Sequence, residues 1–305
     1  MTPDKTLNTL AILMPGDMGH GCASQFRQHG LRVVTCLAGR SQRTKSLAET
    51  AGLENLPSLG DLVQSADLIL SILPPEHALS QAHAVATAMK SAGAYPDYVD
   101  CNAISPTTTK QVAAAFDGLP ARFIDGGIIG LNPVKENGRT RLYVSGQGTS
   151  LVRQLDGRGI IVRDLGDEIG RASAMKMIYA SSTKGAFTLF AAVAVMAELA
   201  GLRDEIFHEF AQSQPATMAT IERMTPRIPL DAKRWIYEME EIARTYDDYG
   251  MTPHFHQGAA AIMRLADLTP LAAGTRETAQ DDHALADVLQ MYVDALRAKP
   301  KPYSY

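Results

Sequence analysis

Apolar positions along the chain follow two different periods, and the change between them falls near residue 166. Before it, short runs rich in aliphatic and β-branched residues alternate with stretches of helical periodicity, which is typical of parallel strands covered on both faces. Strands are predicted at residues 10–13, 31–37, 67–73, 98–101, 122–125, 142–145 and 160–162, with helices such as 44–51 and 108–116 between them. This alternation predicts an α/β fold with a doubly wound parallel sheet, a Rossmann fold.

After residue 166 the pattern is helical. Residues 172–200 contain no proline and a single interior glycine, Gly185, and predict one helix about 44 Å long at 1.5 Å per residue. Its second half, residues 185–199, is apolar almost all round, which is typical of a helix buried on every side. More helices are predicted at residues 205–212, 216–224, 232–246, 257–265 and 281–298. We expect a dinucleotide-binding domain over residues 1–166 and an all-helical domain for substrate binding and dimerisation over residues 167–305.

Composition narrows the function classes. The 305 residues are 46% hydrophobic and 20% charged, an ordinary globular mixture with room for two domains. A net charge of −4 gives no overall basic surface for a nucleic acid. The longest uncharged helical run, residues 185–197, is shorter than the roughly 20 residues that span a membrane, and the short apolar run near the N-terminus is expected to be a strand and not a signal peptide. Three cysteines, Cys22, Cys36 and Cys101, fit neither a closed disulfide set nor a zinc site. We expect a cytoplasmic protein with a small-molecule substrate, no metal, and no nucleic-acid or membrane partner.

The turn after the first strand carries the first chemical signal. Residues 13–22 read LMPGDMGHGC, and the dinucleotide-binding pattern GxGxxG falls on Met14, Gly16 and Gly19, so methionine replaces the first glycine. Gly16 would let the backbone approach a pyrophosphate, and Gly19 would let the helix pack on the sheet. The residues expected at the cofactor are Pro15, Gly16, Asp17, Met18 and Gly19. The alternative is a glycine-rich turn of another α/β protein.

The second signal is a basic turn after the second strand. An NAD enzyme usually places an acidic residue here for the ribose hydroxyls, but the first one is Glu49. Arg40, Ser41 and Arg43 stand in the turn instead. A guanidinium group suits a 2′-phosphate, which a carboxylate would repel. We therefore expect NADP as the cofactor, with NAD possible, and the alternative is a solvated basic turn.

Five segments together resemble one family. LMPGDMG, ADLILSILPP, VDCNAISP, FIDGGIIG and GRASAMKMIYASSTKG are similar, in order and spacing, to the β-hydroxyacid dehydrogenases, which include 3-hydroxyisobutyrate and 6-phosphogluconate dehydrogenases. The C-terminal segment RWIYEMEEIARTYDDYG resembles a poorly characterised subgroup with a phosphogluconate-dehydrogenase-like C-terminal domain. The resemblance implies a Rossmann domain, an all-helical domain and hydride transfer with a nicotinamide cofactor.

The resemblance also implies roles for individual residues. The family's catalytic lysine falls on Lys176, and Asn102 takes the position beside the nicotinamide and the substrate. Leu73 and Pro74 come from the segment expected along the cofactor, and Gly130 keeps the glycine of the substrate loop.

Other positions depart from the family. The polar neighbours of the substrate glycine are replaced by Ile129 and Leu131, and Ala180 stands where the family has asparagine four residues after the lysine. The family's second lysine falls near Tyr237 or Glu238. These losses argue against a simple carboxylate-bearing hydroxyacid as the substrate and leave the hydride chemistry unaffected.

The chemistry of Lys176 can be argued from its neighbours. The lysine lies among apolar residues at the start of a predicted buried helix, and partial burial beside an oxidised nicotinamide would lower its pKa. A lysine with a lowered pKa suits a general base that takes the hydroxyl proton during oxidation, and the same group is the acid in reduction. The alternative is a lysine that only extends its charged end to water from an amphipathic helix.

Further polar residues lie in the helical part. Lys184 follows Lys176 by about two helical turns and is a candidate ligand for a substrate oxyanion. The alternative is a surface lysine beside a run of hydroxyl residues that pack between helices. In a strand-like loop His254 and His256 would share one face and line the substrate site, with His256 the candidate contact. The alternatives are a plain surface turn and a metal-binding pair. Glu238 is expected on a solvated helix face.

Three functions remain open. The leading hypothesis is an NADP-dependent dehydrogenase or reductase that acts on a small hydroxy compound and its carbonyl partner. The second is an imine reductase, which shares this architecture but typically lacks the lysine. The third is a regulator that binds NADP without turnover. A homodimer is expected, because residues 185–199 are too apolar for one small domain to cover.

Overall fold

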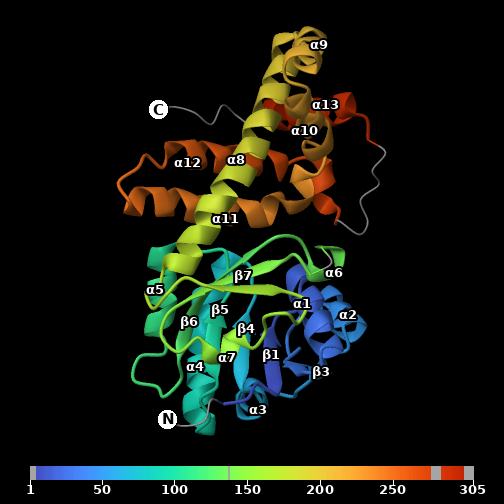
Figure 1. Ribbon diagram of the computed structural model, residues 1–305. Coiled ribbons are helices and arrows are strands. Elements are labelled where there is room, and N and C mark those ends of the chain that lie inside the picture. The colour runs from blue at the N-terminus through green and yellow to red at the C-terminus, as the bar shows by residue number, and fades with distance from the viewer. Residues whose placement is uncertain (1–4, 137, 276–282, 299–305) are drawn as a thin grey trace. The chain divides into compact units, whose positions relative to one another are not determined.

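The computed structural model describes residues 5–136, 138–275 and 283–298. The chain divides into two compact units, Met1–Met177 and Ile178–Tyr305. The division falls inside one long helix, α8 (Arg171–Ala200), whereas the sequence pattern changes near residue 166. Figure 1 shows the elements along the chain.

The first unit is built on an eight-stranded sheet with the order β3-β2-β1-β4-β5-β6-β7-β8. All neighbouring strands are parallel except β6 and β7. The strands are β1 (Thr9–Leu13), β2 (Arg32–Thr35), β3 (Glu54–Asn55), β4 (Leu68–Ser71), β5 (Asp97–Asp100), β6 (Phe123–Ile129), β7 (Arg141–Ser145) and β8 (Ile161–Asp164). The chain winds outward to β3 and returns to place β4 beside β1, so a ligand crevice is expected at the carboxyl ends of these two strands. The doubly wound sheet confirms the predicted fold class.

Helices cover both faces of this sheet (Figure 1). They are α1 (Asp17–Gln28), α2 (Gln42–Thr50), α3 (Leu59–Ser65), η1 (Pro75–His77), α4 (Ala78–Ala92), α5 (Pro106–Ala114), α6 (Pro133–Glu136) and α7 (Ser150–Arg153). Alternate residues of β1 enter two different cores: Leu10 and Ile12 pack with α1 and α7, whereas Ala11 and Leu13 pack with α3, α4 and α5. Burial on both faces explains why the strands read as continuous apolar runs.

The second unit is helical in its described residues and begins within α8. Its other elements are α9 (Arg203–Ser213), α10 (Pro215–Met224), α11 (Ile228–Asp248), α12 (His254–Ala266), η2 (Pro270–Ala273) and α13 (Leu285–Ala298). Helices α11 and α12 pack against one another, and Trp235, Met239 and Met263 are buried. All predicted helices are present; the first residues of the predicted segment 281–298 lie outside the described residues.

Helix α8 is less buried than its composition predicts. Leu189, Met196 and Leu199 are 47%, 62% and 38% exposed in the single chain, so the expectation of burial on every side is wrong for the chain alone. By length and mean hydropathy α8 would also be long enough to cross a membrane, with 33% of the apolar window buried, a test that core helices of soluble proteins also pass.

Candidate active site

The turn between β1 and α1 adopts the conformation that the dinucleotide pattern requires. Met14 has φ of 51°, in the left-handed region, and is the only residue other than glycine with positive φ among those described. The N–H of Gly16 donates to the carbonyl of Met14 at 2.7 Å and closes the turn. The position of the missing first glycine therefore keeps the backbone geometry that favours glycine, although methionine occupies it.

The two remaining glycines match their expected roles. A Cβ atom added to Gly16 would meet no atom within 4 Å, so the backbone is open to an approaching group. A Cβ atom at Gly19 would lie 3.4 Å from Cγ2 of Ile12, which shows how closely α1 packs on β1. The first turn of α1 carries N–H groups that an α-helix leaves without internal partners, and its dipole favours an anion. These features fit a dinucleotide pyrophosphate.

The basic turn after β2 holds a partly satisfied arginine. Arg40 donates through Nη2 to Oε1 of Gln81 on α4 at 2.8 Å, while its Nε is buried without a hydrogen-bond partner. A buried unpaired donor is costly, which makes a ligand acceptor at this position favourable. Ser41 caps α2, because its hydroxyl accepts from the N–H of Thr44 at 3.2 Å, and Arg43 is exposed on the first turn. Gln81 was not found from the sequence.

Asn102 is fully engaged within the chain. Its carbonyl accepts from the N–H of Leu73 at 2.6 Å, and its amide donates to Oγ of Ser71 at 3.1 Å and to Oδ2 of Asp100 at 2.9 Å. Asn102 therefore ties the loop after β4, which contains Leu73 and Pro74, to the end of β5. The structure places all three residues at the carboxyl edge of the sheet and gives Asn102 a bracing role.

Two buried carboxyl groups lie on neighbouring strands beneath these loops. Asp100 of β5 and Asp125 of β6 are paired in register and are each 1% exposed. Burial raises the pKa of Asp100 to about 7. Burial also raises the pKa of Asp125, against the opposing effect of several hydrogen-bond donors. Neither residue was predicted; the available signal was an acid at the end of an apolar strand.

Lys176 lies where the sheet and α8 meet. Its Nζ donates to the backbone carbonyl of Ile128 near the carboxyl end of β6. A Cβ atom at Gly127 would come within 2.6 Å of the carbonyl of Ala172 and 3.0 Å of Cβ of Lys176, so only glycine lets α8 approach β6 this closely. The half-buried lysine amine is thereby held at the same edge of the sheet as the β1–α1 turn.

The loop after β6 contains the predicted substrate glycine. Gly130 has φ of 124°, in the region that favours glycine. Leu131, which replaces a polar family residue, is 59% exposed. The buried side chain of Asn132 donates to the carbonyl of Asp17 at 2.7 Å and joins the loop to the start of α1. Sequence reasoning missed Asn132, because its partner lies 115 residues away.

Lys184 has a different setting from the one predicted. Its amine pairs with Glu238 of α11, and the two side chains are only 12% and 3% exposed. Arg234 also donates to Glu238, at 2.8 Å. The expectation that Glu238 lies on a solvated helix face is therefore wrong, because this carboxylate is buried between two cations. Glu238, one of the two residues near which the family's second lysine falls, is instead the counter-ion of Lys184.

The two histidines begin a helix and do not lie in a strand-like loop. The N–H of His256 donates to the carbonyl of Pro253 at 3.0 Å as α12 starts, so residues two apart point to different sides. His254 is exposed and contacts Gln257, whereas His256 is 3% exposed, with its ring 4.4 Å from that of Tyr246. Burial lowers the pKa of His256, and its Nδ1 has no hydrogen-bond partner. The predicted shared face does not form.

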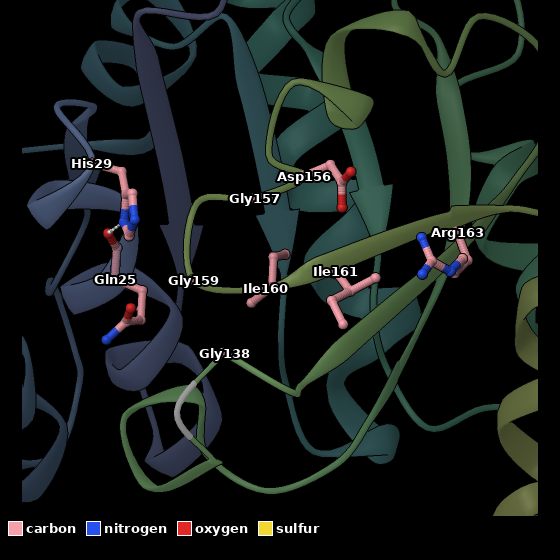
Figure 2. Close-up of a pocket in the computed structure, with 9 residues that line it drawn as sticks. All are labelled: Gln25, His29, Gly138, Asp156, Gly157, Gly159, Ile160, Ile161 and Arg163. Carbon is pink, nitrogen blue, oxygen red and sulfur yellow. Dashed lines mark hydrogen bonds between the residues drawn. The ribbon is translucent and has the colours of Figure 1, made fainter.

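A shallow depression of about 480 Å³ lies elsewhere on the first unit. Figure 2 shows Gln25 and His29 at the end of α1 on one side of it and Arg163 of β8 on the other. None of the predicted site residues lines it. No group of three potential metal-binding side chains occurs within the described residues.

Both parts of the chain match known family models. Residues 10–155 match the model of the NAD binding domain of 6-phosphogluconate dehydrogenase, and residues 197–266 match a domain of unknown function, DUF1932. An uncharacterized 28.5 kDa protein from Methanothermus fervidus is 28% identical over 191 residues, 63% of this chain and 72% of that protein.

Solved structures of the same fold cover nearly the whole chain. A conserved protein of unknown function, described as structurally similar to 3-hydroxyacid dehydrogenases, is 26% identical with a TM-score of 0.62, covering 85% of this chain and 96% of its own. The 3-hydroxyisobutyrate dehydrogenase of Mycobacterium tuberculosis, solved with L-serine, is 18% identical with a TM-score of 0.61, covering 93% and 99%.

Proposed function

We propose that this chain, a nicotinamide-dependent dehydrogenase of the β-hydroxyacid dehydrogenase family, uses NADP to interconvert a small hydroxy compound and its carbonyl partner, with Lys176 as the general acid and base. The observation that carries the proposal is the placement of the Lys176 amine at the carboxyl edge of the sheet, against the carbonyl of Ile128. This is the edge at which a doubly wound sheet binds its ligands.

The proton chemistry follows from this placement. When bound, the cofactor accepts or supplies the hydride. The Lys176 amine takes the proton from the substrate hydroxyl during oxidation and returns a proton to the oxygen during reduction. Gly16, whose backbone is open, and the first turn of α1 would hold the pyrophosphate, and Leu73 and Pro74, in the loop braced by Asn102, would lie along the cofactor.

Arg40 supports NADP over NAD. Its buried Nε has no hydrogen-bond partner and its Nη2 is held by Gln81, so the guanidinium is oriented before any ligand arrives. A 2′-phosphate supplies the acceptor that this donor lacks, together with a charge of the right sign. The basic residue Arg43 on the next helix adds to the attraction.

The substrate end is less polar than in the familiar family members. Ile129 is buried and Leu131 exposed beside Gly130, and Lys184 is paired with Glu238. We propose that Gly130 lines the substrate, and that Lys184 and His256 belong to a substrate-binding domain over residues 167–305. Because the polar neighbours of Gly130 are lost, a carboxylate-bearing hydroxyacid would be a poor substrate.

One alternative rests on a specific observation, and a second remains from the sequence. A reductive aminase from Aspergillus terreus, solved with NADPH and ethyl levulinate, shares the fold with 16% identity and a TM-score of 0.54, which favours testing C=N reduction. The presence of Lys176 argues against it, because imine reductases of this architecture typically lack the lysine. A non-catalytic NADP-binding regulator would bind the cofactor and turn over no substrate.

We also propose a cytoplasmic homodimer. Ile178, Leu189 and Met196 are exposed and are spaced by 11 and 7 residues, about three and two helical turns, so they share one face of α8. Exposed apolar faces of this kind mark association surfaces. A second copy that covers this face would account for the apolar composition of the helix.

The direct test is a panel of hydroxy, carbonyl and imine compounds followed at the NADPH absorbance band, with Lys176→Met as the control. Oxidation of an alcohol that depends on Lys176 supports the proposal. Turnover confined to imines would favour the reductive aminase alternative, and tight NADPH binding without any turnover would favour the regulator.

A further inference from the structure

Asp125 makes an unusual set of contacts for a buried carboxylate. Its Oδ2 accepts from the backbone N–H groups of Gly170, Ala172 and Ser173 at 2.9, 3.0 and 3.1 Å. The hydroxyl groups of Ser145 and Ser173 donate to the same oxygen at 3.0 and 3.3 Å. The other oxygen, Oδ1, is buried without a hydrogen-bond partner. The carboxylate is thus aimed at the N-terminus of α8, where the helix dipole favours a negative charge.

This contact is not an ordinary helix cap. A cap normally comes from the residue just before the helix, whereas Asp125 precedes its backbone donors by 45 to 48 residues and belongs to β6. It therefore fixes the first turn of α8 to a strand of the sheet. Gly126 and Gly127 follow at once, and a Cβ atom at Gly127 would collide with the carbonyl of Ala172. The charge of Asp125 and the absence of a side chain at Gly127 act together to seat the helix on β6.

Lys176 follows Ala172 by four residues, which places both on one face of α8. Its amine reaches back to the carbonyl of Ile128, three residues after Asp125 on the same strand. Strand β6 and helix α8 are thus joined at two points: Asp125 binds the first turn of the helix, and the carbonyl of Ile128 accepts from the lysine amine. A shift of the helix start would move the amine relative to the sheet.

We propose that Asp125 is a positioning residue that sets where the Lys176 amine lies, by holding the first turn of α8 on β6. The proposal rests on the proposed acid and base role of Lys176. A misplacement of a reacting group by about 1 Å can lower turnover about 10²-fold. No ligand contact is assigned to Asp125.

The test that needs no substrate is the reactivity of Lys176. The purified full chain is treated with acetic anhydride across a range of pH, and acylation of each lysine is measured by mass spectrometry. Asp125→Ala should raise the acylation rate of Lys176 severalfold at a given pH, because the amine leaves its place against Ile128. The acylation rate of Lys135, an exposed lysine of α6, should not change. Asp97→Asn is the matched control, because Asp97 is a buried carboxylate of β5 that pairs with Arg122.

Turnover gives the second readout, as a double-mutant cycle. With a substrate from the panel, Asp125→Ala should lower kcat about 10²-fold and leave NADPH affinity unchanged. In the Lys176→Met background the same change should lower kcat less than about twofold, because no amine is left to misplace. A twofold change is about the error within which the effects of independent mutations add. Asp125→Asn keeps an acceptor oxygen without the charge, so it should act in the same direction and more weakly. It carries the test if Asp125→Ala does not fold.

The outcomes separate the two proposals. Unchanged Lys176 acylation in the Asp125 variants, or an equal further loss of kcat in the Lys176→Met background, would overturn the positioning role. Near-native turnover of Lys176→Met would instead refute the acid and base assignment, and the acylation rates would still report whether Asp125 holds the amine.

Discussion

Arg40 gives the sharpest test of cofactor choice. Replacing Arg40 with alanine removes the guanidinium whose Nε is buried without a partner and frees Gln81, its neighbour on α4. If Nε donates to the 2′-phosphate, the variant loses a hydrogen bond to a charged group. Such a bond contributes about 1.5–3 kcal/mol, which corresponds to a roughly 10- to 150-fold weaker Kd for NADPH. NADH has no 2′-phosphate, so its affinity should be nearly unchanged.

The measurement is a fluorescence or calorimetric titration of each cofactor into the wild type and the variant at one fixed salt concentration. Gln81→Ala should weaken NADPH in the same direction and less, because Arg40 loses its support and keeps its charge. Arg153→Ala, an exposed arginine of α7, controls for a general loss of positive charge. Equal losses for NADPH and NADH in Arg40→Ala would refute the reasoning, because the residue would then not distinguish the phosphate.

Four other predictions are independent of this one. Lys176→Met should keep the fold and NADPH affinity and lower turnover about 10²–10⁴-fold, as steady-state kinetics would show. Light scattering at micromolar concentration should give a dimer with an interface above about 2,000 Å², and a monomer would contradict this. Lys184→Met should destabilise the chain by about 3 kcal/mol in urea unfolding, since it leaves Glu238 buried with less compensation, and Glu238→Gln in the same chain should restore part of the loss. The contribution of Asp100 to stability should fall by up to about 4 kcal/mol as the pH rises from about 4 to about 7, because burial raises its pKa to about 7 and the folded chain keeps a proton that the unfolded chain has lost. Asp100→Asn should remove that part of the slope.

The fold was predicted well from the sequence, because runs and periods of apolar residues are visible within short segments. Strands such as β1 and β4 are buried at every position and read as apolar runs. The strand β3 was not predicted, because its two residues, Glu54 and Asn55, are exposed and carry no apolar signal. The same reliance on composition misjudged α8, since an apolar helix can leave one face uncovered within a single chain.

In the candidate site, too, local features were predicted and contacts between distant segments were not. Gly16 and Gly19 were identified because the turn and the helix that they serve follow directly in the sequence, whereas Lys176 was identified from the family resemblance, since its partner Ile128 lies 48 residues away. Asp125 and Asn132 were missed because their contacts lie up to 48 and 115 residues away. Such partners leave no periodic trace in a single sequence.

The errors at Glu238 and His256 have a shared cause. A glutamate among charged residues on a helix reads as solvated, but Lys184 on another helix compensates its charge and permits burial. The His-x-His pattern was interpreted as a strand-like pair, but a helix begins at His254, directly after Pro253. In both cases the meaning of a polar side chain depends on the element that packs against it. The same holds for the residues beside the substrate loop. Both family polar positions carry aliphatic side chains here, but Ile129 is buried and Leu131 is exposed, so only Leu131 is available to contact a substrate.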